Sequence, residues 1–244
     1  MDRRRNYGPE TTQPASRQAK DVDCLPRSDG RAKTQTRPVF ARLNSVSKAT
    51  GSAYMEQENT KVTASIELIP VSRSGKQLVV DFRFAPFAHL KRKGYQRDVI
   101  ERDYALIIEE ALLPAIRLVP DIQITVLVVV LQSDGMAASL AASITAASMA
   151  LANAEIEMYD RVIGSAVAFM SAGLFLDPTK DEEDVAKGTV VIAYMPSRAQ
   201  ISHIMQVGRV EKHLAEAIDT SLDACNSLDA VLQKVLLDSL TTQI

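Results

Sequence analysis

The chain has 244 residues, a formal net charge of −2 and 46% hydrophobic residues, which is typical of a globular protein with a core of its own. This charge excludes a polycation that coats DNA, and the lack of Trp with only 5% aromatic residues disfavours a base-stacking platform. Cys24 and Cys225 lack zinc-ligand spacing and indicate a reducing compartment. We expect no secretory signal and no membrane span, because the most apolar stretch, 136–152, is rich in Ser, Thr and Ala.

The positive charge is concentrated at the start of the chain. The first 50 residues hold 11 Lys and Arg against 5 Asp and Glu, so they carry +6 and the remainder carries −8. Residues 1–36 show no hydrophobic periodicity and contain several turn formers, which predicts a basic, flexible N-terminal arm before one domain at 37–244. Such an arm is either an inert tail or a segment that wraps a partner or touches nucleic acid.

The first half of the domain is predicted to be rich in strands. The runs 50–56 and 60–69 predict a hairpin, and 78–84 predicts a third strand. A basic loop at 89–97 precedes a helix from Asp98 to about Leu118, which opens with a capping box of Asp98 and Glu101. Apolar residues at spacings of three and four define its buried stripe. These residues are Ile100, Tyr104, Ile107, Ala111 and Ala115.

The second half alternates strands with helices. A continuous apolar run at 122–131 predicts a buried strand, and the small residues of 138–154 predict a helix that lies close to a sheet. Three further strands are predicted at 158–170, 189–195 and 201–207, followed by a long helix over 210–240. Cys225 lies on the apolar stripe of that helix and is expected to be a core residue. This order indicates an α+β fold with mixed sheets packed with helices on one side.

Generic motifs do not identify a chemistry. The sequence has no phosphate-binding P-loop, dinucleotide fingerprint, zinc-protease motif or nucleophile elbow. His89, His203 and His213 lie far apart and are expected to be structural or surface residues. The acidic run 181–184 is either a solvated loop or a cation site, and the basic run 91–97 is either solvated or holds phosphates.

Several segments, taken in order and spacing, resemble the RNase PH-type proteins. The runs GSAYME at 51–56 and NTKV at 59–62 are similar to the opening hairpin of that family. The runs DFRFAPFA at 81–88, EALLPAI at 110–116 and ITAASMALANA at 144–154 resemble later segments. The resemblance covers roughly 37–240. It implies an RNase PH fold, with two pseudo-symmetric β-α-β-type halves like ribosomal protein S5 domain 2.

A second set of motifs resembles one subtype of ring subunit from the eukaryotic RNA exosome. These motifs are RPVFAR at 37–42, IEMYD at 156–160 and DPTKDEE at 177–183. The resemblance implies a dimer partner of the exosome component seven type, further ring subunits and an S1/KH cap subunit. It also implies single-stranded RNA as a ligand, no DNA or membrane partner, and a location in the nucleus (nucleolus) and cytoplasm. The residues expected to contact RNA are Lys91, Arg92, Lys93, Arg97 and Arg102.

The resemblance also implies a reaction. Active members degrade RNA from the 3′ end with inorganic phosphate, which needs a phosphate-binding arginine at a Gly-Thr-Arg turn and an acidic residue. Here the turn reads DGMAASL at 134–140, so the arginine position is Leu140 and the acid position is Thr189. Leucine cannot bind phosphate, and a neutral hydroxyl is not an efficient acid near neutral pH. At the start of the first long helix, where active members often carry two adjacent arginines, this chain has Glu101-Arg102.

We therefore expect a non-catalytic ring subunit with no catalytic residues, no cofactor and no metal. Its role would be to scaffold 3′-5′ RNA processing and degradation and to line the RNA channel. Two alternatives remain. One is an active phosphate-dependent 3′-5′ exoribonuclease, and the other is an RNA-binding module of related fold outside the exosome.

Overall fold

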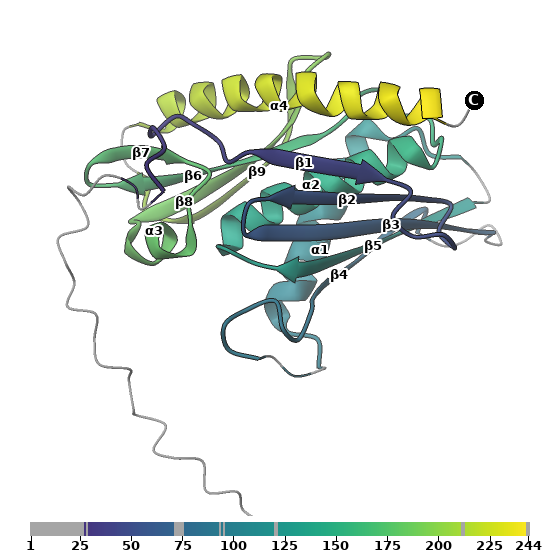
Figure 1. Cartoon of the computed structure of the whole chain (residues 1–244), viewed down its shortest axis with the longest axis horizontal. Helices are drawn as coiled ribbons and strands as arrows, with labels where there is room; N and C mark the ends of the chain where they lie inside the picture. Colours follow the sequence, from purple (N-terminus) through teal and green to yellow (C-terminus); the bar gives the residue numbers. More distant parts are fainter. Residues whose placement is uncertain are drawn as a thin grey trace, which may run out of the picture.

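Two β-sheets form the framework of the protein in a computed structural model, which describes residues 27, 29–70, 76–92, 94, 96–119, 122–210 and 213–242. The first sheet has the strand order β1-β2-β3-β5-β4 and the second the order β7-β6-β8-β9 (Figure 1). The strands of the first sheet are β1 (Val39–Leu43), β2 (Gly51–Gln57), β3 (Thr60–Pro70), β4 (Leu78–Phe84) and β5 (Ile122–Gln132). Those of the second are β6 (Ile163–Met170), β7 (Gly173–Leu176), β8 (Gly188–Met195) and β9 (Gln200–Gly208).

Helices pack on both sheets. They are α1 (Val99–Leu112), the short 3-10 helix η2 (Leu113–Ala115), α2 (Met136–Asn153), α3 (Lys180–Val185) and α4 (Leu214–Thr242). The α+β architecture is as expected, but only the first sheet is mixed: its β4 and β5 are parallel, while its other strand pairs and all those of the second sheet are antiparallel. The predicted hairpin is confirmed as β2 and β3. The turn between them places Glu58 at a φ of 52°.

Helix α1 begins as predicted and ends sooner. Asp98 is its N-cap, and the capping box with Glu101 is present. The Glu101 carboxylate also accepts the backbone N–H of Phe84 at 2.9 Å, which fixes α1 against the end of β4. The α-helix ends at Leu112 rather than near Leu118, because Pro114 tightens the chain into η2. Ile100 was predicted to be buried, but it is 40% exposed.

Helix α2 forms the centre of the molecule. Every residue from 137 to 151 is buried, and the helix contacts strands of both sheets. Small side chains allow this close packing: a Cβ added to Gly164 on β6 would lie 2.3 Å from the backbone oxygen of Ala141. The Gly164 N–H also donates to Thr145 Oγ1 at 2.9 Å. By length and composition α2 is the one described helix apolar enough to cross a membrane, but its window is 83% buried within the protein.

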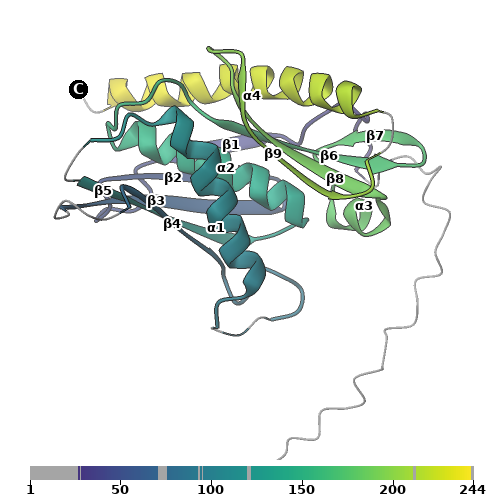
Figure 2. The same cartoon turned by 180° about the vertical axis from the view of Figure 1, so that it is seen from behind.

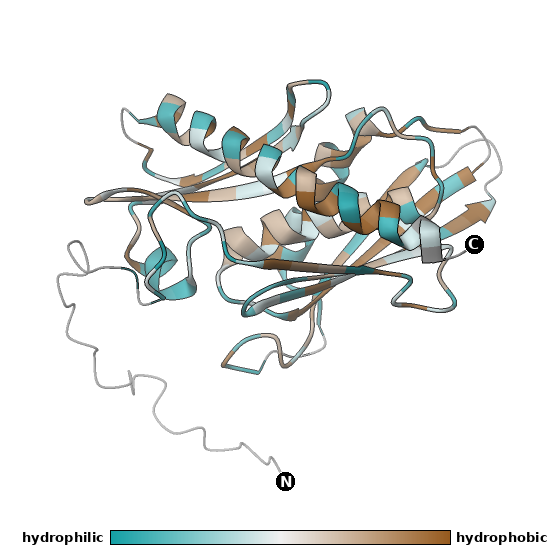
Figure 3. Cartoon of the chain, turned by 45° about the horizontal axis from the view of Figure 1, so that its top comes forward, coloured by the Kyte–Doolittle hydropathy of each residue, from teal (hydrophilic) through white to brown (hydrophobic). Residues whose placement is uncertain are grey.

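The second sheet is covered on both faces, which corrects the expectation of helices on one side. All eight residues of β6 are buried, and β6 contacts both α2 and α4. Helix α4 lies along the outside with a mixed hydrophilic and hydrophobic surface (Figure 3). Cys225 on α4 has no exposed area and its thiol pKa is raised to about 12 by burial, so the predicted core role is confirmed.

Sequence patterns missed three elements and misplaced the start of one. Strand β1, strand β7 and helix α3 were not predicted, because each is short. The acidic run 181–184 lies in α3, where Thr179 and Glu182 form a capping box. The strand predicted at 158–170 begins at Ile163, and Met158 makes only an isolated bridge with Ile116.

The structure describes the last part of the predicted N-terminal arm, at residues 27 and 29–36, while 1–26 and 28 are outside the described residues. Arg27 is only 7% exposed, and the Lys33 carbonyl accepts the backbone N–H of Leu176 at 2.8 Å. Arg27 and Lys33 therefore contact the β7 edge of the second sheet, and the boundary at residue 36 stays a prediction.

We expect Gly164→Ala to destabilise the fold by about 1–3 kcal/mol, because the new methyl group would overlap the backbone of α2. The free energy of unfolding, measured by urea denaturation, checks this. Gly94→Ala is the matched control, because no described atom lies within 4 Å of the position of its added Cβ. Equal stability of the two variants would contradict the tight contact between β6 and α2.

Candidate functional site at the N-terminus of helix α2

A cavity of about 230 Å³ lies where α1, α2, α3 and the second sheet meet. Carboxylates of α3, the phenol of Tyr104 on α1 and a hydroxyl of β8 supply its polar side chains, and the rest of its wall is mainly apolar. Its lining residues are Tyr104, Met136, Ala137, Glu183, Asp184, Thr189, Val191, Met205 and Val207. None of these described lining residues is basic, so the cavity offers no side-chain cation to an anionic ligand.

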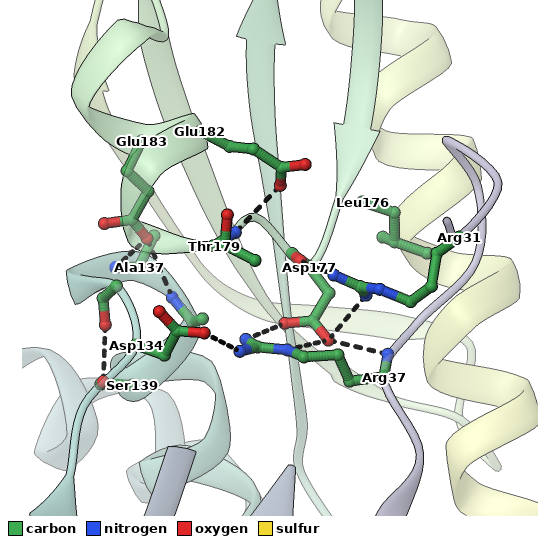
Figure 4. Close-up of polar contacts among 12 residues, drawn as sticks. Arg31, Arg37, Asp134, Ala137, Ser139, Leu176, Asp177, Thr179, Glu182 and Glu183 are labelled. Atoms are coloured by element: carbon green, nitrogen blue, oxygen red, sulfur yellow. Dashed lines mark hydrogen bonds and ion pairs between the residues drawn. The ribbon is translucent and has the colours of Figure 1, made fainter. Parts of the chain in front are cut away.

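The first amides of α2 point at the Glu183 carboxylate (Figure 4). Glu183 Oε2 accepts the N–H of Met136 at 2.6 Å, and Oε1 accepts that of Ala137 at 2.8 Å and that of Ala138 at 3.3 Å. The start of a helix attracts negative charge, because its first N–H groups have no intrahelical partner. A carboxylate from α3 therefore fills the anion-binding end of α2.

Local backbone geometry makes room for this carboxylate. Gly135 precedes α2 with a φ of 116°, and a Cβ there would lie 2.7 Å from Glu183 Oε1. Ser139 Oγ donates to the Gly135 carbonyl at 2.6 Å and lies 2.8 Å from Ser133 Oγ, which holds the turn. Burial is the largest influence on Glu183 and raises its pKa, while the three amide bonds act in the opposite direction.

A second charged cluster lies beside the first, centred on Arg37. Its guanidinium donates to Asp177 Oδ1 at 2.6 Å and to Oδ2 at 2.9 Å, and the Arg37 backbone N–H donates to Oδ2 at 2.9 Å. Asp134 Oδ2 accepts a further bond from Arg37 at 3.2 Å. Arg37 is 1% exposed and Asp177 is 6% exposed, so this ion pair is buried. It connects the start of the first sheet to the end of β7.

Arg27 holds α3 in place from the other side. Its Nε donates to Glu182 Oε1 at 3.0 Å. Glu182 Oε2 accepts the backbone N–H of Thr179 at 2.9 Å, as Figure 4 shows. The neighbouring Glu183 is thereby aimed at α2. Glu182 and Glu183, the two middle residues of the acidic run, thus form hydrogen bonds with other groups of the chain. Among the described residues, no group of three or more His, Cys, Asp or Glu could hold a metal ion.

The two positions at which the family resemblance places catalytic groups have different surroundings. Thr189 lies on β8, paired with Ala168 and Val207, and it lines the cavity. Leu140 lies in the second turn of α2 with no exposed area, packed in the hydrophobic core. Only one of these two positions therefore borders the cavity.

The residues predicted to contact RNA lie in the β4–α1 loop and on α1. Lys91 and Arg92 are exposed in the loop between β4 and α1, while Lys93 lies outside the described residues. Arg97 forms an ion pair with Asp81 on β4. Arg102 is exposed on α1. The loop supplies positive charge, but part of that charge is balanced by a neighbouring carboxylate.

The histidines take no part in the cavity. His203 Nδ1 on β9 lies 3.6 Å from Glu110 Oε2 of α1, and His213 Nδ1 lies 3.1 Å from Glu216 Oε2. His89 packs against the ring of Phe84 with centroids 4.7 Å apart. Each histidine thus has a separate local contact, as the sequence spacing predicted.

Comparison with known proteins identifies the family. A model described as "3' exoribonuclease family, domain 1" matches residues 35–157, and "3' exoribonuclease family, domain 2" matches residues 160–224. The chain belongs to the RNase PH family of 3′ exoribonucleases. The resemblance inferred from the motifs is confirmed.

Within this family, the chain is similar to proteins named as exosome components. The human Exosome complex component MTR3 is 36% identical over 260 residues, which covers 96% of this chain and 94% of that protein. The Schizosaccharomyces pombe Exosome complex component mtr3 is 33% identical and covers 91% and 93%. A crystal structure of rice Rrp46 has a TM-score of 0.77 at 23% identity, covers 86% of this chain and 100% of that chain, and shows the same fold.

We expect Asp177→Asn to lower the free energy of unfolding by about 3–5 kcal/mol at neutral pH, because it removes the closer of the two carboxylates that pair with buried Arg37. Burial raises the pKa of Asp177, but bonds and charge from Arg37 outweigh burial and hold this pKa below its ordinary value. The carboxylate therefore stabilises the fold above about pH 4, and its contribution is lost as the pH falls through the lower, folded-state pKa.

Urea denaturation of wild type and variant at pH 7, and then at steps down to about pH 3, measures this difference. The gap between the two should narrow below about pH 4. The exposed Asp103→Asn should stay within about 0.5 kcal/mol of wild type at every pH. A gap for Asp177→Asn that is independent of pH would contradict the role of its charge.

Proposed function

We propose that this chain is a non-catalytic RNase PH-like subunit of the RNA exosome ring, which scaffolds the complex that processes and degrades RNA from the 3′ end. Its similarity to exosome components named MTR3, over 91–96% of its length, supports a place in such a ring. The neighbours proposed are a ring subunit of the component seven type and an S1/KH cap subunit. The proposed locations are the nucleus, including the nucleolus, and the cytoplasm.

The observation that carries the non-catalytic part is the Glu183 carboxylate bound to the first three amides of α2. The family resemblance places phosphate at this turn, where amides and an arginine would hold it. Here the amides already have an acceptor, in either protonation state of Glu183. A phosphate oxygen brought to ~4 Å from the ionised carboxylate would be repelled by about 4 kcal/mol at an effective dielectric of ~20.

Two further residues support this proposal. Leu140 takes the position of the phosphate arginine and is buried in the core, so it supplies neither charge nor a donor. Thr189 takes the position of the acid and contributes a neutral hydroxyl to the cavity. Loss of a single positioned donor or acid costs about 3–4 kcal/mol of transition-state stabilisation, so the combined departures oppose phosphorolysis.

We expect no phosphate-dependent shortening of RNA by the chain co-purified with its ring partner. The assay uses 5′-labelled single-stranded RNA with and without inorganic phosphate and Mg²⁺, and it detects nucleoside diphosphates. A phosphorolytic RNase PH enzyme on the same RNA is the positive control. Phosphate-dependent shortening that is abolished by Thr189→Val would instead favour the active exoribonuclease.

The exposed basic residues of the β4–α1 loop are proposed to guide single-stranded RNA by charge, without reading its sequence. Lys91 and Arg92 are the principal candidates, since Arg97 is engaged by Asp81. Lys93 and Arg102 complete the proposed set.

We expect the double variant Lys91→Glu and Arg92→Glu to weaken RNA binding to the assembled ring. We also expect it to reduce the slope of log K against log salt by about 0.7 for each lost contact. Fluorescence anisotropy at several salt concentrations measures both quantities. The matched control is Lys48→Glu with Lys234→Glu, two exposed lysines elsewhere that change the net charge equally. Equal affinities of the two double variants would remove the loop from the proposed RNA path.

A further inference from the structure

The strands at the edges of the two sheets differ in how they are protected. An exposed edge presents unpaired N–H and C=O groups that can pair with another chain, and proteins shield such edges by charge, shortness or a cover. Strand β4 carries Asp81 and Arg83, and strand β1 carries Arg42. Strand β7 has four residues, and Lys33 covers its end through the bond to Leu176.

Within the part of the chain that the structure describes, strand β9 has none of these three protections, although its pairing with β8 is irregular between Ala193 and Tyr194. It runs for nine residues with the sequence QISHIMQVG, which contains no Lys, Arg, Asp, Glu or Pro. Ile201, Ile204 and Val207 are 37%, 45% and 52% exposed, whereas all the residues of neighbouring β8 except one are buried. A long, uncharged and partly apolar edge is typical of a surface that pairs with another strand.

The two faces of β9 have different neighbours. His203 approaches Glu110 of α1, and Met205 and Val207 line the cavity, so these alternate residues face α1 (Figure 2). Side chains alternate along a strand, so Ile204 faces away from α1. A strand added to β9 would therefore extend the second sheet and close the open side of the cavity next to Val207.

We propose that the free edge of β9 docks an uncharged, extended strand of a neighbouring RNase PH-like ring subunit, which continues the second sheet across the interface. This inference rests on the proposed function, since it names the surface by which the chain joins the ring. Backbone hydrogen bonds supply the affinity of such an addition, and apolar side chains at alternate positions supply its specificity. Ile204 and Val207 offer those contacts on the two faces.

A heterologous neighbour fits β9 better than a second copy of this chain. Antiparallel pairing of two β9 strands about a two-fold axis would bring both α1 helices to the same face of the joined sheet. The two copies of Glu110, each 67% exposed at its side chain and 3.6 Å from His203, would then lie on one face of the joined sheet. Like charges at an interface disfavour association. The neighbour is thus expected to present a neutral or basic residue beside Glu110.

Hydrogen exchange in the assembled complex tests the pairing directly. The chain is co-expressed with the other ring subunits of the same organism, and exchange of the amides of 200–208 is compared between the free chain and the complex. We expect at least tenfold slower exchange at alternate amides of β9 on assembly. Strand β1, an edge of the other sheet, serves as the internal reference.

A substitution on the edge gives a second measure. Ile204→Lys places a charge on the exposed edge, and we expect at least tenfold weaker association with the ring subunits. Phe40→Lys on β1, at a site 56% exposed, is the matched control and should associate like wild type. Circular dichroism confirms that both variants fold.

Each outcome of these experiments has a distinct meaning. Assembly with protected β9 amides and a weak Ile204→Lys variant supports the inference. Assembly with unprotected β9 amides overturns it and leaves the proposed function standing. If the β9 amides exchange slowly in the chain alone at high concentration, a second copy of the chain pairs with β9. That result overturns the inference that a different subunit does so. Failure of the wild-type chain to join the ring overturns the proposed function and this inference together.

Discussion

Arg37 connects the parts of this molecule that carry its site. It stands just before the first strand of one sheet, and its guanidinium binds Asp177 at the end of β7 and Asp134 just before α2. With 1% of its surface exposed, this cation could persist only with such partners, because an unpaired buried charge costs several kcal/mol. Two carboxylates that would otherwise repel each other are thereby held next to the start of α2, and the turn before α2 takes a fixed position.

That fixed position determines what the cavity can do. In a phosphorolytic site the amides at a helix start are kept available for an anion that arrives and leaves. In this structure Glu183 accepts hydrogen bonds from these amides, and Arg27 holds the helix that carries Glu183 through the adjacent Glu182. The same physical property, partial positive charge at the start of α2, therefore stabilises the packing of α3.

The sequence predicted the local features of this fold well and its long-range contacts poorly. The hairpin β2–β3 and the capping box of Asp98 and Glu101 follow from neighbouring residues, and both are present. The pairing of Arg37 with Asp177 spans 140 residues, and no spacing rule connects them. The sequence marks Glu183 only as one member of an acidic run. Its hydrogen bonds could not be predicted, because the amides that it binds lie 45–47 residues away in the chain. Leu140 and Thr189 were marked by the family resemblance rather than by any periodicity.

The burial of α2 bears on how the protein can be divided. By sequence, α2 belongs to the first family domain, at 35–157, and strands β6 and β8 belong to the second, at 160–224. Yet those strands pack on α2, and a helix buried at every residue from 137 to 151 has no face left for solvent. Expressed alone, the second half would lose the partner that covers its sheet, and the first would expose half of a core helix. We therefore expect the two domains of the family model to behave as halves of one cooperative unit rather than as parts that fold separately.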